Sequence, residues 1–351
     1  MHAPATQVTI QLPDDWHLHL RDGDMLGETV PATARCFKRA IVMPNLVPPV
    51  RTAQQAMAYK ERILAANTSG NPFEPQMTLY LTDETTPKDI QAASQAGIRV
   101  VKLYPAGATT NSSSGVTNIE ALLPVLSALM EFNMLLLVHG EVTDSHVDIF
   151  DREKEFIDQR LQPLVRRLPD LRVVMEHITT ADAVAFVSEG GENLAATITP
   201  QHLLLNRNDL LVGGIRPHNY CLPVLKRNTH QQALRHAVAT GSKRFFLGTD
   251  SAPHEQASKE NACGCAGCYS AWAALELYAQ VFDELGVLDK LEGFASHHGA
   301  DFYGLPRNTG TVTLERTPWQ VPESITLPNG RSIIPFMAGA TVNWKVSSVA
   351  F

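Results

Sequence analysis

The chain has 351 residues, with 29 basic and 36 acidic side chains and a formal net charge of −7. Hydrophobic residues make up 44% and charged residues 19%, which supports a large core and excludes a disordered chain. The mildly acidic balance gives no reason to expect nucleic acid or an anionic membrane as a partner. No apolar run approaches the roughly 18 residues that cross a bilayer, and no secretory signal begins the chain. We therefore expect a soluble, cytoplasmic protein.

The sequence shows no sign of division into several domains. A prior of about 150 residues per domain permits two, but α/β barrels commonly exceed that length as one unit. No linker, charge block or low-complexity tract interrupts the chain, so we expect a single domain over residues 1–351. Five cysteines are too few, and odd in number, for a disulfide framework in a chain of this length.

Short apolar runs alternate with helix-like stretches along the chain. The first run, at 16–20, alternates apolar and polar residues, and seven more follow at 41–43, 77–81, 100–103, 135–138, 173–175, 195–198 and 245–247. Helices are predicted between them, most clearly at 118–132, at 180–188 and at a segment that ends at Gly241. We expect Thr229 to cap that last helix, with Gln232 completing a capping box.

A polar residue follows each apolar run. These residues recur about every 33 positions, which matches one strand–helix unit of about 30 residues or more. Eight such units predict an α/β fold, a (β/α)8 TIM barrel whose functional site lies at the C-terminal face of the strands. An open doubly wound sheet is the alternative, but no glycine-rich dinucleotide motif follows an early strand. The eight residues are His19, Asn45, Asp83, Lys102, His139, His177, His202 and Asp250.

Several of these residues are of the types that bind zinc in hydrolytic enzymes. His17 and His19 lie two positions apart on a predicted strand, so both rings project from one face and can bind one ion. His139, His177 and Asp250 each end an apolar run, where a buried polar side chain without a partner would be costly. Their convergence at one barrel mouth predicts a metal centre.

Lys102 is the unusual member of this set, because a cation facing metal ions would be repelled. Burial and nearby positive charge favour its neutral amine, which can add carbon dioxide. The resulting carbamate could bridge two metal ions about 3.5–4 Å apart. Alternatively, Lys102 forms an ion pair with Asp83, Glu141 or Glu176.

Together these segments resemble the dihydroorotases of the amidohydrolase superfamily, in their short, bacterial, homodimeric form. The resemblance covers nearly the whole chain, with blocks in family order from residue 15 to at least residue 303. The matching segments are DWHLHLRDG at 15–23, MPNL at 43–46, KLYP at 102–105, VHGE at 138–141, EHITT at 176–180, TPQHL at 199–203 and GTDSAPH at 248–254.

The resemblance implies a binuclear metal centre with two Zn²⁺ per chain. By it, carboxylated Lys102 (N6-carboxylysine) bridges the two ions. The remaining implied ligands are His17, His19 and Asp250 for one ion, and His139 and His177 for the other. The substrate site implied by the resemblance consists of Arg21, Asn45 and His254, with backbone groups of Leu222 and Ala266.

The implied reaction is the reversible cyclisation of N-carbamoyl-L-aspartate to (S)-dihydroorotate and water in pyrimidine (UMP) biosynthesis. A zinc-bridging hydroxide would attack the ring carbonyl, with Asp250 as general acid and base. A flexible loop at 105–115 would close over this small-molecule substrate through Thr109 and Thr110. The resemblance also implies a homodimer.

Two other kinds of protein remain as alternatives. A hydantoinase-like cyclic amidase of the same superfamily is the nearest, but Arg21 and Asn45 favour a substrate that carries a carboxylate. A non-catalytic relative that kept the barrel would be expected to lose several metal ligands, and all six candidates are present here.

A cysteine cluster is the rival metal site. Cys263, Cys265 and Cys268 could hold zinc or an iron–sulfur cluster, with Cys221 as a fourth ligand. The cluster lacks the paired C-x-x-C units of a structural zinc site, so free thiols in a tight loop are favoured. The sequence assigns no role to Trp272, which follows this loop.

Overall fold

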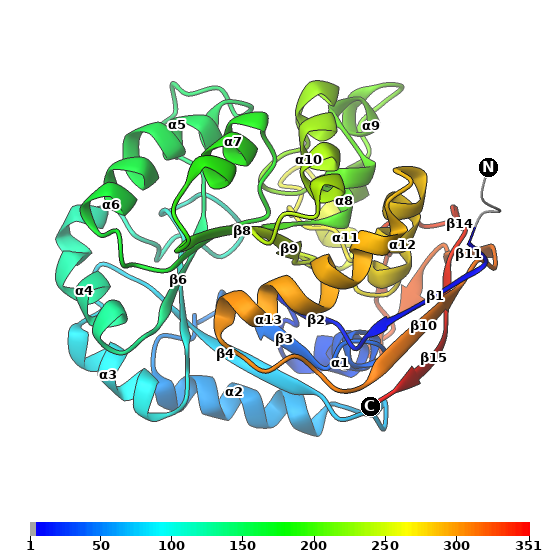
Figure 1. Cartoon of the computed structure of the whole chain (residues 1–351), viewed down its shortest axis with the longest axis horizontal. Coiled ribbons are helices and arrows are strands. Elements are labelled where there is room, and N and C mark those ends of the chain that lie inside the picture. Colours follow the sequence, from blue (N-terminus) through cyan, green and yellow to red (C-terminus); the bar gives the residue numbers. More distant parts are fainter. Residues whose placement is uncertain (1–4) are drawn as a thin grey trace.

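The computed structural model describes residues 5–351 and is built around one parallel sheet (Figure 1). Each of its eight strands pairs with the next one along the chain, from β2 to β9. All eight predicted apolar runs coincide with these strands, so the predicted α/β barrel is confirmed. The strands are β2 (Asp14–Leu18), β3 (Arg39–Val42), β4 (Glu74–Tyr80), β5 (Val100–Leu103), β6 (Leu135–His139), β7 (Val173–Glu176), β8 (Leu194–Ile198) and β9 (Phe245–Leu247).

The sheet curves round until its first and last strands meet. The backbone N–H of Asp250 donates to the carbonyl of His17, and the N–H of His19 donates to the carbonyl of Ser251, each at 2.8 Å. These two bonds lie just beyond the carboxyl ends of β2 and β9. Closure of the barrel therefore brings His17 and His19 next to Asp250.

Helices surround the barrel and connect its strands (Figure 1). A 3-10 turn at Ile119–Leu122 precedes α4, and together they fill the stretch predicted at 118–132. The bounds are α1 (Leu26–Ala34), α2 (Ala53–Ala65), α3 (Pro87–Gln95), α4 (Leu123–Glu131), α5 (Arg152–Phe156), α6 (Gln162–Arg167), α7 (Ala181–Glu189), α8 (Pro200–Leu204), α9 (Arg207–Leu211), α10 (Asn228–Thr240), α11 (Gln256–Lys259), α12 (Ala274–Glu284) and α13 (His298–Tyr303).

For α10, the predicted C-terminal end is confirmed and the predicted N-terminal cap is wrong. Gly241 ends the helix in a left-handed conformation with φ of 70°, which glycine adopts at little cost. The predicted capping box at Thr229 is wrong, because the helix begins at Asn228 and Thr229 lies within its first turn. The side chain of Gln232 instead donates to Asn228 Oδ1 at 3.3 Å.

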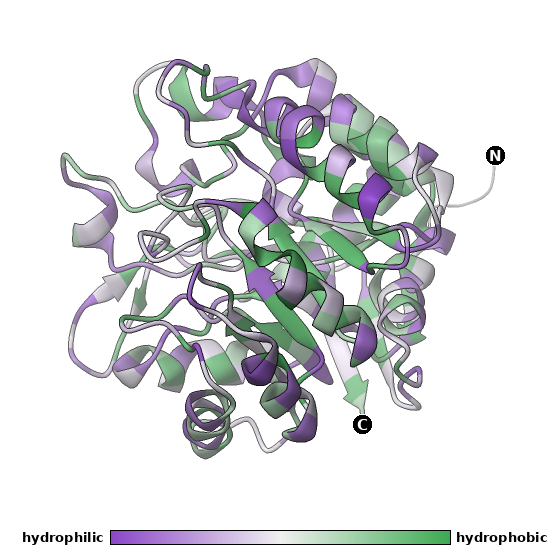
Figure 2. Cartoon of the chain, turned by 90° about the vertical axis from the view of Figure 1, so that its left-hand side faces the viewer, coloured by the Kyte–Doolittle hydropathy of each residue, from purple (hydrophilic) through white to green (hydrophobic). Residues whose placement is uncertain are grey.

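The barrel strands are buried on both faces, and their side chains divide between two cores. In β6, Leu136 and Val138 pack outward against helices, whereas Leu135 and Leu137 join a cluster inside the barrel. In Figure 2 the strands at the centre are mostly green and the helices around them are of mixed colour, so apolar residues concentrate in the sheet. The next inward position after Leu137 is that of His139, so the predicted metal ligands lie directly above the apolar cluster inside the barrel.

A smaller antiparallel sheet lies beside the barrel and was not predicted. It joins β1 (Gln7–Gln11) near the N-terminus to β10 (Thr311–Glu315) and β15 (Lys345–Ala350) near the C-terminus (Figure 1). Two short hairpin-like pairs complete the C-terminal part: β11 (Trp319–Gln320) with β14 (Thr341–Val342), and β12 (Ile325–Thr326) with β13 (Ser332–Ile333).

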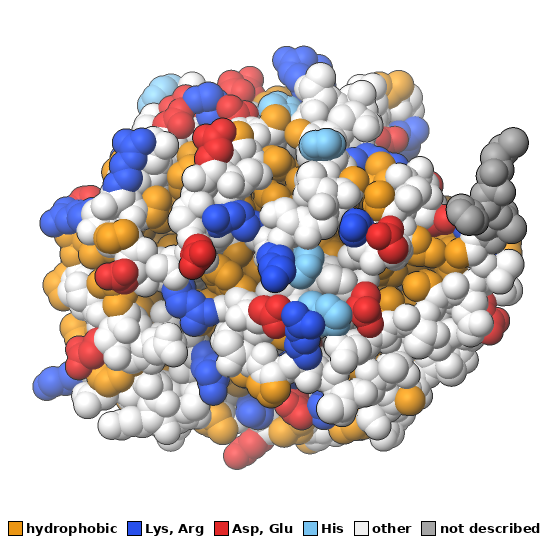
Figure 3. All heavy atoms as spheres, viewed as in Figure 1, with side chains coloured by type: hydrophobic (Ala, Val, Ile, Leu, Met, Phe, Trp, Pro, Cys, Tyr) orange, Lys and Arg blue, Asp and Glu red, His pale blue; other side chains and the backbone are white. Residues whose placement is uncertain are grey.

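The surface carries both signs of charge. Basic and acidic side chains are interspersed over the face shown in Figure 3. Among residues 5–351, none of the helices combines the length and the apolar character that a membrane crossing requires.

Candidate metal centre and substrate site

The six predicted metal ligands meet at the carboxyl ends of five barrel strands. Their side chains are almost completely buried, with Asp250 at 5% and His19 at 8% the most exposed residues of the set. Ring centroids lie 5.4 Å apart for His17 and His19, and 4.9 Å apart for His17 and His177. The ring of His139 lies 4.8 Å from that of His177. The histidines therefore form one continuous cluster.

Two groups within this cluster have ligand atoms close enough to share an ion. His17, His19 and Asp250 form one group, and all of its ligand atoms lie within 4.8 Å of one another. Asp250 Oδ1 lies 3.3 Å from His17 Nε2 and 3.2 Å from His19 Nε2. This group has the composition predicted for the first metal ion. The second group consists of His17, Glu176 and His177.

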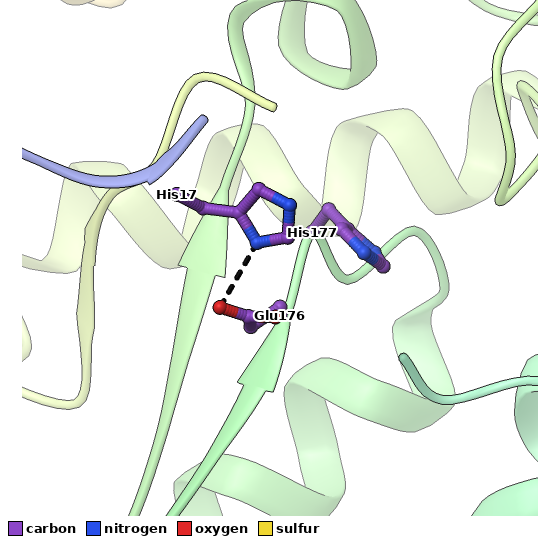
Figure 4. A group of neighbouring side chains, drawn as sticks. All are labelled: His17, Glu176 and His177. Carbon is purple, nitrogen blue, oxygen red and sulfur yellow. Dashed lines mark ion pairs between the residues drawn. The ribbon is translucent and has the colours of Figure 1, made fainter. Parts of the chain in front are cut away.

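Glu176 is a member of the site that the sequence did not identify as a site residue. Its Oε1 lies 2.9 Å from His17 Nδ1, and Figure 4 shows the two side chains turned toward each other beside the ring of His177. Glu176 also forms a fully buried ion pair with the unmodified Lys102. Of the three partners considered for this lysine, Asp83 instead accepts from Thr117. The third, Glu141, lies 2.8 Å from His139 Nε2 through its Oε2.

The backbone explains why two consecutive residues face the site. Alternation along a strand would place Glu176 and His177 on opposite faces of the sheet. His177, however, follows the last residue of β7 and has a φ of 43°. Asp250, after β9, has a φ of 44°. Such left-handed conformations cost free energy in residues other than glycine, so the surrounding structure must stabilise them.

Two buried carboxylates supply part of that stabilisation. Asp15 accepts hydrogen bonds from the N–H and hydroxyl of Thr249, next to Asp250, at 2.9 and 2.6 Å. Glu153 accepts from the N–H and hydroxyl groups of both Thr179 and Thr180, at 2.5–3.0 Å. These bonds hold the backbone just before Asp250 and just after His177.

The donor atoms fit a zinc centre. Both ring nitrogens of His17 and Nδ1 of His177 are buried and have no hydrogen-bond partner within residues 5–351. The His17 nitrogens nevertheless lie close to carboxylate oxygens, an arrangement that a shared cation would stabilise. Imidazole nitrogen and carboxylate oxygen are ordinary zinc ligands. The residues present therefore suit a buried divalent metal.

The electrostatics of the cluster favour the neutral forms of His19 and His177 and the ionised form of Asp250. Burial lowers the pKa of His19 to about 4 and that of His177 well below its usual range. Burial alone would raise the pKa of Asp250, but the adjacent rings of His17 and His19 outweigh it, and the pKa lies well below its usual range. Burial lowers the pKa of Lys102, and Glu176 opposes that shift.

Arg21 and His254, both predicted to bind substrate, lie together at the edge of the cluster. Arg21 Nε donates to the carbonyl of Pro253 at 3.0 Å, and its Nη2 lies 2.9 Å from His254 Nε2. The same His254 nitrogen lies 3.0 Å from the carbonyl of Ala266. Burial and then the charge of Arg21 lower the pKa of His254 to about 2.

Asn45 connects the metal cluster to the predicted flexible loop. Its Oδ1 lies 2.8 Å from His19 Nδ1, and its Nδ2 donates to the carbonyl of Thr110 at 3.0 Å. The hydroxyl of Thr110 donates to the carbonyl of Ala266 at 3.4 Å. The backbone N–H of Thr109 donates to Ser112 Oγ at 2.8 Å, a hydrogen bond within the loop. The loop therefore rests over the site.

The cysteines lie outside the groups of close potential ligand atoms found among residues 5–351. Cys263 is exposed, whereas Cys221 and Cys268 are buried.

Trp272, to which the sequence assigns no role, packs against Trp319 with ring centroids 5.4 Å apart. The two rings line a cavity of about 670 Å³.

Comparison with known sequences assigns the family. A profile of the amidohydrolase family matches residues 14–319. A dihydroorotase from Pseudoalteromonas atlantica is 71% identical over 342 residues, which cover 97% of this chain and 99% of that protein. The chain belongs to the amidohydrolase family and, within it, to the dihydroorotases. As a member of this family it is a metal-dependent hydrolase of the cyclic amidase type.

Solved dihydroorotase structures share the whole fold. The crystal structure of a dihydroorotase from Campylobacter jejuni has a TM-score of 0.90 at 35% identity and covers 99% of both chains. A dihydroorotase from Saccharomyces cerevisiae, in complex with 5-fluoroorotic acid, has a TM-score of 0.91 at 33% identity. That match covers 97% of this chain and 98% of the yeast chain.

The hydantoinase alternative has only distant support. An L-hydantoinase (dihydropyrimidinase) from Arthrobacter aurescens has a TM-score of 0.75 at 16% identity, covering 98% of this chain and 85% of that one. Such a likeness indicates the shared barrel fold alone. The dihydroorotase assignment therefore rests on sequence identity over nearly the whole chain.

Proposed function

We propose that the chain interconverts (S)-dihydroorotate and N-carbamoyl-L-aspartate, with ring closure and release of water in the direction of pyrimidine biosynthesis. The observation that carries the proposal is that the buried cluster of four histidines and Asp250 lies beside Arg21 and His254. The cluster of histidines and Asp250 suits the hydrolysis of an amide. The pair of Arg21 and His254 suits a substrate that carries a carboxylate.

We propose that two zinc ions occupy the cluster. His17, His19 and Asp250 would hold one ion, and His139 with His177 would hold the other. Lys102 is a fully buried lysine in contact with Glu176, and we propose that it becomes carboxylated and contributes to both ions. Bound zinc would supply Lewis acidity and a source of hydroxide near neutral pH.

Asp250 is the proposed general base and acid. Its carboxylate is ionised and buried, and its Oδ1 lies among the rings of His17 and His19. It would accept the proton of the attacking water and deliver it to the departing ring nitrogen. In the direction of ring closure the same oxygen would move the proton in reverse.

The contacts of His254 support a carboxylate between it and Arg21. One ring nitrogen cannot accept from the guanidinium and donate to the Ala266 carbonyl at the same time. A bound carboxylate would accept from both side chains and remove this conflict. We propose that Asn45 also binds this carboxylate, aided by the backbone at Leu222 and Ala266.

The loop at 105–115 is proposed to cover the bound substrate. Thr110 already contacts Ala266 and Asn45 from above the cluster. When Thr109 and Thr110 turn their donors to the substrate, the loop would exclude water and complete the site. This movement would break the hydrogen bonds that Thr110 now makes with Asn45 and Ala266.

The decisive experiment measures dihydroorotate hydrolysis together with the zinc content of the purified protein. We expect activity with about two zinc ions per chain, and hydantoin to be a far poorer substrate. Activity confined to hydantoins would overturn the substrate assignment. A fully active enzyme with one zinc ion would overturn the binuclear centre.

We also propose a cytoplasmic homodimer, as in the short bacterial dihydroorotases that the sequence resembles. Sedimentation equilibrium at micromolar concentration should give twice the mass of one chain. A monomer of full specific activity would contradict the proposed assembly.

A further inference from the structure

The loop at 260–268 carries a proposed substrate contact, and its holding side-chain contacts lie near its two ends, at Glu260, Asn261 and Cys268. It reads Glu-Asn-Ala-Cys-Gly-Cys-Ala-Gly-Cys, so small residues dominate. Ala266, the proposed contact, lies near its end. The stretch 265–267 itself offers only small side chains, so its position depends on bonds to its backbone.

Lys259, the last residue of α11, anchors this stretch through such bonds. It is only 4% exposed, and its Nζ donates to three backbone carbonyls. These belong to Tyr220 at 3.1 Å, Cys265 at 2.8 Å and Gly267 at 2.6 Å. An ammonium group has three N–H donors, so all of them are used. Leaving such a buried charge without partners would be costly, which fixes the three carbonyls around it.

The three carbonyls lie on the two segments proposed to meet the substrate. Cys265 and Gly267 flank Ala266, and Tyr220 lies two residues before Leu222. The N–H of Gly267 also donates to the Tyr220 carbonyl at 2.9 Å, which joins the two segments directly. The ammonium of Lys259 therefore contacts both segments. The Ala266 carbonyl is left for His254 and Thr110.

We propose that Lys259 is a positioning residue for substrate binding: its ammonium holds the backbone at Leu222 and Ala266 where the substrate is bound. The identity of the substrate rests on the proposed function, whereas the anchoring of the loop does not. Lys259 touches neither the substrate nor the candidate metal ligands, so it acts on affinity through the loop and leaves the chemical step to the metal cluster.

The test uses the zinc-loaded enzyme and the substitution Lys259→Met, which keeps the length of the side chain and removes its charge. We expect KM for dihydroorotate to rise about tenfold while kcat changes by less than about threefold and zinc content stays constant. Hydrogen exchange of peptides covering 258–268 should become faster. A purely structural lysine would change stability without separating KM from kcat.

Lys226→Met is the matched control. Lys226 is also 4% exposed, but its Nζ makes one backbone bond, to Val224 at 3.0 Å. The control should leave exchange at 258–268 unchanged. A Lys259→Met enzyme with wild-type KM and wild-type exchange would overturn the proposal.

Two further measurements test the role of Lys259 if the variant does not fold or if the proposed function is wrong. If Lys259→Met does not fold, hydrogen exchange of the Gly267 amide is measured in the wild-type protein. Strong protection from exchange supports the anchor, and exchange as fast as in an exposed loop overturns it. If the wild-type protein does not act on dihydroorotate, the proposed function fails, and the exchange comparison alone still judges the anchor.

Discussion

His19 and Asn45 form a hydrogen bond that determines which ring nitrogen of His19 faces the metal cluster. His19 Nδ1 lies 2.8 Å from the amide oxygen of Asn45, which can only accept, so the proton resides on Nδ1. Nε2 is then left with a free lone pair on the side of Asp250. The amide nitrogen of Asn45 donates to the Thr110 carbonyl. The Asn45 side chain is therefore held by the loop at one end and by the proposed metal ligand His19 at the other.

Substitutions of Asn45 should separate these two roles. Asn45→Asp keeps an acceptor for His19 but removes the donor and adds negative charge near the proposed carboxylate site, so KM should rise about tenfold or more with zinc content unchanged. Asn45→Leu removes the bond to His19 and should weaken zinc binding by about tenfold or more. Steady-state kinetics and zinc titration measure the two effects. Wild-type KM in Asn45→Asp would contradict the substrate role.

Asp250→Asn should abolish turnover while leaving a folded protein. An amide cannot take up and release the proton that the reaction moves, and losses of about 10²–10⁴-fold are typical for such groups. The measurement is kcat at saturating zinc, with metal content and circular dichroism recorded in parallel. Asp289→Asn is the control, because the Asp289 side chain is 72% exposed. A rate for Asp250→Asn near that of the control would remove Asp250 from the mechanism.

Much of this site could be predicted from the sequence because the barrel strands are buried on both faces. In such strands almost every residue is apolar, so Lys102 and His139 stand out as polar residues at inward positions. Glu176 was missed as a site residue for a specific reason. By strict alternation only one of Glu176 and His177 can face inward, and the predicted inward residue is His177. The positive φ of His177 breaks that alternation, and no sequence pattern reveals it.

The residues that support the site could not be recognised in the same way. Asp15, Glu153 and Lys259 are buried charges whose partners are backbone groups on other segments. In sequence, Glu153 and Lys259 look like ordinary solvated residues of a helix. Only the fold shows that their partners are buried with them. The sheet of β1, β10 and β15 was missed for a related reason, since its first and last strands are far apart in sequence and half exposed.

Removal of the metal should destabilise the protein reversibly. Without an ion, buried imidazole nitrogens such as His177 Nδ1 have no partner among the residues described. Zinc at about 100 times its dissociation constant should stabilise the native state by about 2.7 kcal/mol, since it binds the folded state preferentially. Calorimetry of chelated and zinc-reconstituted protein measures the shift in Tm, and magnesium serves as the control ion. Equal Tm values with and without zinc would argue against a metal site here.

Glu153→Gln should lower the free energy of unfolding by about 3 kcal/mol, because a buried acceptor would be replaced by an amide that points N–H groups at donors. The carboxylate accepts from Thr179 and Thr180, which follow His177, so zinc affinity should fall as well. Urea denaturation and zinc titration give the two values. Glu61→Gln, at an exposed position of α2, is the control and should change neither. A variant as stable as this control would exclude Glu153 from a supporting role.

His202 predicts how stability depends on pH. Its ring lies 2.7 Å from Thr199 Oγ1 and 2.9 Å from the Pro223 carbonyl. Burial, followed by the charge of Lys226, lowers the pKa of His202 from 6.5 to about 4. The hydrogen bond to the Pro223 carbonyl, and after it the charges of Asp250 and Glu141, oppose the shift without cancelling it.

Between these two pKa values the unfolded chain carries a proton on His202 that the folded protein lacks. The unfolded state therefore binds more protons, and stability falls as the pH falls from 6.5 to 4, by up to about 1.4 kcal/mol per pH unit from this group. His202→Gln removes the titration. The variant should be less stable than wild type at pH 8, and the difference should narrow steadily below pH 6.5 in urea denaturation. His236→Gln, at an exposed position of α10, should leave the pH profile of wild type unchanged. A difference between His202→Gln and wild type that stayed constant as the pH fell would show that His202 titrates alike in both states, and that its burial does not contribute to acid lability.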